Sequence, residues 1–253
     1  MTLSTLNTYA LIWIAFGILL FPFLFKIKQP YGRHIAKGWG PLMDNKLGWI
    51  LQELPSPIFL SIFFFMHNTP KPLIAYLLWF LWVLHYFYRS VIFPLRTKTT
   101  GKKIPVLIVL FAIGFNFING FLNGTYLGDF FSPNTDSSLL FFARICIGAI
   151  VFFTGVFINH QADNILLNLR KPGETDYKIP TGGLYKYISC PNYFGEMIEW
   201  LGFAIMAWSL PALSFAVWTV VNLAPRAFDH HKWYQEKFAD YSKERKALIP
   251  KVL

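Results

Sequence analysis

The chain has 253 residues, of which 55% are hydrophobic, 19% aromatic and 14% charged, and its formal net charge is +10. A soluble domain carries about 25% charged residues, so this composition excludes a soluble fold and indicates an all-α integral membrane protein. The positive charge does not indicate nucleic-acid binding, because the basic residues collect between apolar runs rather than on one solvated face. Cys146 and Cys190 offer neither a disulfide framework nor a metal-ligand spacing.

Seven apolar runs approach the length of about 20 residues that a helix needs to cross a membrane. In chain order, the predicted spans are 9–25, 47–66, 73–93, 104–122, 139–159, 193–209 and 211–228. The last two are short and joined by Leu210-Pro211, which predicts a helical hairpin, and a six-span count is the main alternative. No repeat or linker divides the chain, so we expect one membrane-embedded domain over residues 1–253.

The distribution of lysine and arginine predicts the orientation of these spans. With the N-terminus outside, the segments 26–46, 94–103, 160–192 and the tail from Arg226 face the cytoplasm and hold 20 of the 23 basic residues. This asymmetry favours seven spans with the C-terminus in the cytoplasm. The membrane is a bacterial inner membrane or the endoplasmic reticulum, depending on the host.

Glu53 lies inside the second apolar run, in the segment Gln52 to Pro57. A carboxylate in such surroundings is protonated or paired, and a raised pKa is what a proton donor at neutral pH requires. The alternative is that Glu53 ends a helix at the headgroup level and the prolines begin a new one.

The third run carries Tyr86 and Arg89, whose spacing of three residues predicts a shared helical face. Tyrosines are common at membrane interfaces, which is the plain explanation for Tyr86. Arg89 weakens that explanation, because a buried guanidinium needs an anionic or carbonyl partner.

Two further sets of polar residues share helical faces at the cytoplasmic ends of predicted spans. Asn159 and Asp163 are four residues apart, and Arg226, His230 and Tyr234 repeat the same interval. Such lines suit a nucleotide, with arginine on phosphate and carboxylate or amide on ribose or nicotinamide. The alternative is a helix end docked by hydrogen bonds.

A metal site is not expected at His230 and His231, because adjacent histidines point about 100° apart on a helix and no multi-histidine array accompanies them. A Rossmann fingerprint is also absent from the sequence. If a dinucleotide binds, side chains of membrane helices and the glycine-bearing loop must hold it.

Taken together, the polar segments resemble the steroid 5α-reductase family (3-oxo-5α-steroid 4-dehydrogenases) over nearly the whole chain. The resemblance rests on several short segments in the family's order rather than on any one of them. The segments are Gln52 to Ser56, His85 to Arg89, Asn159 to Asp163, Leu169 to Glu174, Gly182 to Leu184, Asn192 to Glu196, Glu199-Trp200 and Arg226 to Tyr234.

The resemblance implies reduction of the C4–C5 double bond of a 3-oxo-4-ene steroid by NADPH, with hydride added at C5. It implies that Glu53 and Tyr86 hydrogen-bond the 3-oxo group and stabilise the developing enolate. It places around the cofactor the residues Asn159, Asp163, Arg170, Lys178, Asn192, Glu196, Arg226, His230 and Tyr234. Lys178 stands where the family often has an arginine, so the charge is kept without the bidentate geometry. The basic loop around Lys98, Lys102 and Lys103 is a weaker candidate for the phosphates.

Three other functions stay open. A trans-2-enoyl-CoA reductase of the same superfamily would perform the same conjugate reduction on a thioester. A membrane methyltransferase that uses S-adenosylmethionine would not need the Glu53 and Tyr86 pair, and a sterol-binding protein would not depend on a nucleotide. The expected partners are an apolar steroid-like substrate and the lipid bilayer, with no nucleic acid and no obligate protein partner.

Overall fold

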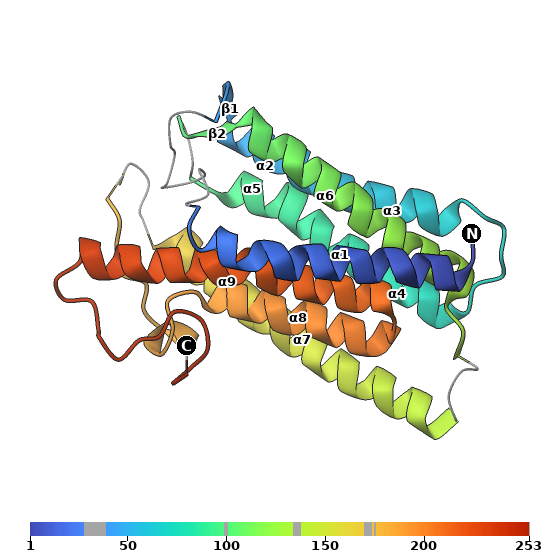
Figure 1. Ribbon diagram of the computed structural model, residues 1–253. Helices are drawn as coiled ribbons and strands as arrows, with labels where there is room; N and C mark the ends of the chain where they lie inside the picture. The colour runs from blue at the N-terminus through green and yellow to red at the C-terminus, as the bar shows by residue number, and fades with distance from the viewer. Residues whose placement is uncertain (28–38, 99–100, 134–137, 170–173, 175, 253) are drawn as a thin grey trace. The chain divides into compact units, whose positions relative to one another are not determined.

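The computed structural model describes residues 1–27, 39–98, 101–133, 138–169, 174 and 176–252. Within this part the chain is mostly helical, with a single pair of very short strands (Figure 1). The helices are α1 (Leu3–Leu24), α2 (Asn45–Glu53), α3 (Pro55–Phe65), α4 (Leu73–Phe87), α5 (Phe93–Arg96), α6 (Val106–Thr125), α7 (Ser138–Asn168), α8 (Pro191–Ala207) and α9 (Leu210–Lys237).

Shorter elements extend or connect these helices. Two π-helical turns, η1 (Tyr88–Ile92) and η2 (Tyr126–Phe130), follow α4 and α6 directly, and a 3-10 turn, η4 (Gly183–Lys186), precedes α8. Strand β1 (Leu42–Asp44) pairs antiparallel with β2 (Lys103–Pro105). This pair ties together the starts of α2 and α6, the helices that follow the two strands.

Five helical stretches among the described residues are long and apolar enough to cross a membrane. They are Leu3–Leu24, Asn45–Phe65, Leu73–Arg96, Val106–Phe130 and Ser138–Asn168. The prediction of a helical membrane protein is therefore confirmed. Helix α8 has 17 residues, and α9 ends in a polar stretch, so the count of seven spans and the orientation stay predictions.

Two helices continue beyond the ends predicted from hydropathy. The sequence predicts that the fifth span ends at Asn159 and that a loop follows, whereas α7 continues to Asn168. In the same way, the last span is expected to end at Phe228, and α9 continues to Lys237. Hydropathy marks where a helix leaves apolar surroundings, but the backbone hydrogen bonds that define the helix continue into polar sequence.

The described chain forms two compact units. The first comprises Met1–Trp13, Lys28–Phe142 and Ala207–Ala212, and the second comprises Ile14–Ile27, Ala143–Met206 and Leu213–Leu253. Each unit is described by itself below. The expectation of a single domain stays a prediction.

In the first unit, α6 and the η2 turn that continues it pack closely on α3 through three glycines. Gly120 and Gly124 in α6 and Gly128 in η2 recur every four residues along the chain. A Cβ at Gly120 would lie 2.6 Å from the Cβ of Phe59, and one at Gly124 would lie 2.6 Å from the carbonyl oxygen of Leu60. Small residues at this spacing allow membrane helices to approach backbone to backbone. The row therefore fixes α3 against α6.

In the second unit, α7 and α8 meet through glycines on both helices, and Figure 1 shows them side by side. A Cβ at Gly195 would lie 2.5 Å from the amide nitrogen of Asn159 and 2.8 Å from the carbonyl oxygen of Gly155. A Cβ at Gly148 would lie 2.9 Å from the carbonyl oxygen of Gly202. This contact leaves no room for side chains between the helices, and it brings the polar end of α7 against the start of α8.

Candidate active site

Glu53 lies where one helix ends and the next begins. Helix α2 ends at Glu53, α3 begins at Pro55, and Leu54 between them keeps helical angles of φ −58° and ψ −33°. Pro55 and Pro57 have no N–H, so the carbonyls of Leu51 and Glu53 lose their usual helical donors. The predicted alternative is thus correct in that the prolines begin a new helix. The break nevertheless falls in the middle of the membrane-length stretch Asn45–Phe65 rather than at its end.

The side chain and backbone next to Glu53 are held by two amides. Gln52 donates from Nε2 to Oε1 of Glu53 at 3.3 Å. Asn116 of α6 donates from Nδ2 to the carbonyl oxygen of Gln52 at 2.6 Å, and Asn116 is buried. The geometry at the helix break therefore depends on a hydrogen bond from a second helix.

Sequence reasoning missed Asn116. A signal was present, because Asn116, Asn119 and Asn123 interrupt an apolar run, and polar residues at membrane depth usually face the protein interior. Asn119 accepts a hydrogen bond from Nε1 of Trp13 at 3.3 Å, and Asn123 donates to the carbonyl oxygen of Asn119 at 3.0 Å.

Tyr86 is buried on α4, with 6% of its surface exposed. Its ring stacks on Trp82, with centroids 5.8 Å apart, and Nε1 of Trp82 donates to Oγ of Ser56 at 3.1 Å. Ser56 is in the first turn of α3, immediately after the break at Glu53. The Trp82–Ser56 hydrogen bond thus joins the helix that carries Tyr86 to the segment that carries Glu53. Burial argues against the plain explanation of Tyr86 as an interfacial tyrosine.

Arg89 lies in the π-helical turn η1, two residues after α4 ends. Its guanidinium lies 5.3 Å from the ring centroid of Trp49 and 4.8 Å from that of Phe93, both within the range of cation–π contacts. Nε1 of Trp49 donates to the Arg89 carbonyl oxygen at 3.0 Å. Single π-helical turns are frequent at functional sites, where they change the direction of the following side chains.

In the second unit, three predicted residues come together at the contact between α7 and α8. Asn159 donates from Nδ2 to the carbonyl oxygen of Asn192 at 2.9 Å. Asn192 donates from Nδ2 to Oδ1 of Asp163 at 3.3 Å. Asn159 and Asp163 are both fully buried. We call these three residues the amide–carboxylate cluster.

Arg226, His230 and Tyr234 all lie on α9, as their spacing predicts. His230 and Tyr234 each contact a tyrosine. Nε2 of His230 lies 3.2 Å from the hydroxyl oxygen of Tyr193 on α8. Tyr234 is buried and stacks on Tyr241, with centroids 5.3 Å apart and 7° between the rings. Arg226 and Glu196 are partly buried, on α9 and α8 respectively.

Of the two residues of the loop that the resemblance places near the cofactor, Arg170 and Lys178, the structure describes only one. Arg170 lies outside the described residues. Lys178 is at the surface, where Nζ lies 2.5 Å from Oε2 of Glu174 four residues earlier. This exposed ion pair is not among the buried contacts of the amide–carboxylate cluster.

The adjacent histidines of α9 contact different groups. His230 meets Tyr193, whereas Nδ1 of His231 lies 2.6 Å from Oγ of Ser189. Burial, and then the nearby charge of Lys246, lower the pKa of His231 below its ordinary value. Among the described residues, no group of three or more histidine, cysteine, aspartate or glutamate side chains could hold a metal ion.

Ser189 is also where the C-terminal segment docks. Its Oγ lies 2.6 Å from the hydroxyl oxygen of Tyr241, and its amide donates to the carbonyl oxygen of Lys246 at 2.9 Å. Lys246 in turn donates its amide to the carbonyl oxygen of Tyr187 at 2.9 Å. Sequence reasoning missed this contact, because its partners are more than forty residues apart and no local pattern marks them.

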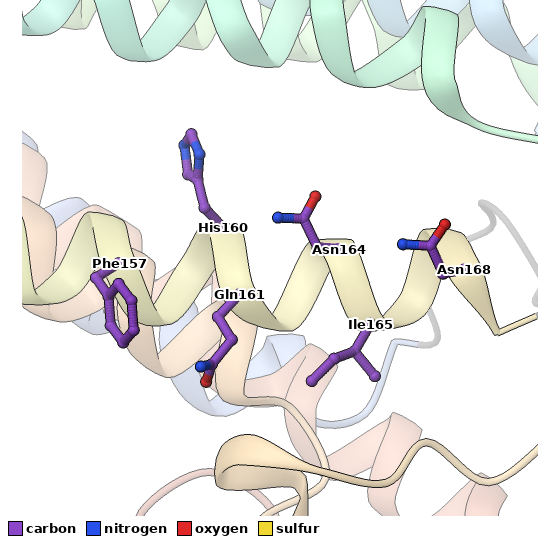
Figure 2. A pocket seen from close by; sticks show the side chains of 6 residues that line it. All are labelled: Phe157, His160, Gln161, Asn164, Ile165 and Asn168. Atoms are coloured by element: carbon purple, nitrogen blue, oxygen red, sulfur yellow. The ribbon is translucent and has the colours of Figure 1, made fainter.

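A groove of about 490 Å³ lies along α7 (Figure 2). Figure 2 shows His160, Asn164 and Asn168 pointing to one side of the helix. None of the groove's residues was predicted as a site residue. The residues that line it are Phe157, His160, Gln161, Asn164, Ile165 and Asn168.

The fold and these groups define a polytopic helical membrane protein with titratable and amide side chains buried in both of its units, an arrangement typical of membrane-embedded enzymes. The family model described as 3-oxo-5-alpha-steroid 4-dehydrogenase matches residues 102–253. The chain is 40% identical over 235 residues to steroid 5-alpha-reductase DET2 of Gossypium hirsutum, covering 90% of this chain and 89% of the relative.

The chain is also 38% identical over 249 residues to 3-oxo-5-alpha-steroid 4-dehydrogenase 1 of Bos taurus, covering 97% of this chain and 96% of the relative. A plant and an animal relative thus match nearly the full length. The chain belongs to the 3-oxo-5-alpha-steroid 4-dehydrogenase family, a family of oxidoreductases of steroid metabolism, as the resemblance predicts.

Proposed function

We propose that the protein reduces the C4–C5 double bond of a 3-oxo-4-ene steroid to the 5α-steroid with NADPH. The observation that carries this proposal is the near full-length match, at about 40% identity, to relatives named steroid 5-alpha-reductase and 3-oxo-5-alpha-steroid 4-dehydrogenase. The same match favours a steroid over an enoyl thioester, and a reductase over a methyltransferase or a sterol-binding protein. Five membrane-length helices suit an apolar substrate that enters from lipid.

Glu53 and Tyr86 polarise the substrate. Each donates a hydrogen bond to the 3-oxo oxygen, which draws electrons from C5 and stabilises the enolate that forms when hydride adds there. To donate, Glu53 must be protonated, and a position within a membrane-length stretch favours the neutral carboxyl group. C4 of the enolate then takes a proton that originates in solvent, so the steroid gains two hydrogens in all.

Asn116 and Gln52 orient the acid. The Asn116 amide holds the backbone at Gln52, and the Gln52 side chain donates to one oxygen of Glu53. That hydrogen bond orients the Glu53 carboxyl group through one of its oxygens. Asn116 is therefore a positioning residue, which acts through Gln52 and does not contact the substrate.

The second unit holds the nucleotide. Its amide–carboxylate cluster offers the donors and acceptors that ribose hydroxyls and a carboxamide require, so these residues fit a nicotinamide dinucleotide. NADPH, when bound, supplies the hydride. Glu196, Arg226, His230 and Tyr234 extend the same site, and Arg170 and Lys178 hold the phosphates.

The topology in this proposal has seven spans in one functional domain, with the N-terminus outside and the C-terminus in the cytoplasm. The concentration of basic residues in the segments 26–46, 94–103, 160–192 and the tail supports it. The nucleotide-binding residues then face the cytoplasm, where NADPH is available. The membrane is the bacterial inner membrane or the endoplasmic reticulum.

The test is an assay of purified protein in detergent with testosterone or progesterone and NADPH, with the product identified by chromatography and mass spectrometry. We expect a product with two additional hydrogens and 5α geometry. Absence of any steroid product, together with reduction of a trans-2-enoyl-CoA, would contradict the proposed substrate. Binding of S-adenosylmethionine in place of NADPH would contradict the reaction class.

A further inference from the structure

Tyr185 is the inward-facing residue of the turn that precedes α8. The turn begins with Gly182 and Gly183, whose φ angles of +92° and +49° lie in the region that favours glycine. The Tyr185 amide donates to the Gly182 carbonyl oxygen at 3.1 Å, which closes the 3-10 turn. Tyr185 is 1% exposed, while the next two residues, Lys186 and Tyr187, are exposed. The glycine turn therefore directs this phenol into the protein.

The Tyr185 hydroxyl is buried and, among the residues that the structure describes, has no hydrogen-bond partner. Buried polar groups are almost always paired, because an unpaired one has lost its water without replacement. An apolar phenylalanine would fill the same space without that cost. A hydroxyl at such a position indicates a partner outside the described residues, such as a bound ligand.

Two of the groups near this residue, Asp163 and Tyr234, belong to the proposed nucleotide site. Burial raises the pKa of Tyr185 well above its ordinary value, and the neighbouring Cys190, Asp163, Tyr234 and Tyr193 raise it further. The phenol therefore stays protonated and able to donate. Asp163 belongs to the amide–carboxylate cluster, and Tyr193 contacts His230. The turn that carries Tyr185 also lies against α7 on both sides of Asp163, since a Cβ at Gly183 would lie 2.6 Å from Oε1 of Gln161 and one at Gly182 would lie 3.8 Å from Cδ1 of Ile165.

We propose that Tyr185 is a further nucleotide-binding residue. Its hydroxyl donates a hydrogen bond to an uncharged polar group of the dinucleotide that lies near Asp163, either a ribose hydroxyl or the carboxamide. This inference rests on the proposed function. A phosphate is excluded as the partner because the Asp163 carboxylate would repel it. An uncharged hydroxyl or amide can accept from the phenol and also donate to the carboxylate.

The test compares Tyr185→Phe with the wild-type protein and with Tyr187→Phe, a control that removes an exposed hydroxyl from the same segment. Binding of NADPH and of NADH to the purified proteins is measured by fluorescence, and thermal unfolding is measured without nucleotide. We expect Tyr185→Phe to weaken NADPH and NADH binding by the same factor, about tenfold. We expect its unfolding temperature without nucleotide to equal or exceed that of the wild type, because no hydrogen bond among the described residues is lost.

Unchanged nucleotide affinity in Tyr185→Phe would overturn the inference, and so would a lower unfolding temperature without a change in affinity, since that would show a structural role. If Tyr185→Phe weakened the binding of NADPH but not of NADH, the partner of the hydroxyl would be the phosphate by which the two nucleotides differ. That result would contradict an uncharged partner. If the wild-type protein binds neither nucleotide, the proposed function fails as well. Binding by the wild type with no effect of Tyr185→Phe overturns this inference alone.

Discussion

Glu53 and Tyr86 in the first unit and the amide–carboxylate cluster in the second are positioned by different means. In the first unit, irregularities within single helices set the geometry: a proline break after Glu53 and a π-helical turn after Tyr86. In the second unit, regular helices meet at glycines, and the polar groups come from segments far apart in the chain. Local irregularity leaves a sequence signal, whereas a long-range contact leaves little.

The two regions also differ in the chemical surroundings that they provide. The first unit places a carboxyl group and a phenol at membrane depth, where hydrogen bonds to a developing charge are strong. The second unit places amides and a carboxylate at the polar end of α7, beyond the apolar run. Substitutions in the first should therefore affect the chemical step, and substitutions in the second should affect nucleotide binding.

Glu53→Gln and Tyr86→Phe should have the largest effect. Tyr86→Phe removes a proposed donor to the 3-oxo group, and Glu53→Gln replaces the acidic O–H donor by a much less acidic amide N–H. We therefore expect kcat to fall by about 10²–10³-fold, the range for loss of one such donor. NADPH affinity should stay unchanged. Steady-state kinetics and nucleotide binding measure the two quantities. Tyr76→Phe, which removes an exposed phenol from the same helix, should keep wild-type activity. Full turnover in both site variants would contradict the roles assigned to the pair.

Gly195→Ala should disturb the second region. The added Cβ would lie 2.5 Å from the Asn159 amide nitrogen, so the helices must separate, and overpacking of this kind costs about 1–3 kcal/mol. We expect a lower unfolding temperature and weaker NADPH binding. Gly114→Ala is the matched control, because a Cβ there meets nothing within 4 Å. Identical behaviour of the two variants would show that the cluster does not depend on the close helix contact.

Asn116→Ala should have a smaller effect on the first region. It removes the hydrogen bond to the Gln52 carbonyl oxygen, typically worth about 0.5–1.5 kcal/mol, so we expect kcat to fall about threefold to tenfold. The KM for NADPH should not change. Asn123→Ala is the control, since Asn123 is equally buried but bonds within its own helix. An equal fall in kcat in both variants would argue for general destabilisation instead of positioning.

The smallest expected effect is a pH dependence of the docked C-terminal segment. The pKa of His231 is lowered in the folded protein, so the unfolded chain binds more protons as pH falls. The stabilising contribution is complete above the unfolded pKa of about 6.5 and is lost as pH falls through the lower folded value. The protection factor of the Ser189 amide, which bonds the Lys246 carbonyl, should therefore fall as pH is lowered from 7.5 to 5.5, once the exchange rate is divided by the intrinsic rate at each pH. In His231→Gln the protection factor should depend less on pH. If this variant kept the pH dependence of the wild type, the role assigned to His231 would be contradicted.

Hydropathy and charge predicted the membrane class and the approximate positions of the first five spans, because the cost of leaving apolar residues in water or charges in lipid acts on each residue locally. Helix ends were predicted less well. The polar end of α7 is helical through Asn168 because backbone hydrogen bonds continue after the apolar run ends. The helical spacing of Asn159 and Asp163 is the local indication of this continuation.

Among the site residues, those on one helical face could be predicted from spacing, as for Asn159 with Asp163. The partner of both, Asn192, is about thirty residues away and is brought there by the glycine contact between α7 and α8. Asn116 leaves a signal, because it interrupts an apolar run, but its partner at Gln52 is far along the chain, and the surroundings of Tyr185 also come from distant segments. Their recognition needed the three-dimensional contact.

The most direct test of the central claim follows the hydrogens in a single turnover. The protein is incubated with testosterone and with NADPH that carries deuterium at the transferred position, and the product is analysed by mass spectrometry and NMR. We expect one deuterium at C5, on the α face, and in a separate reaction with unlabelled NADPH in D₂O, one deuterium at C4. Deuterium from NADPH at C4, or a product without it, would contradict hydride addition to an enone polarised by Glu53 and Tyr86.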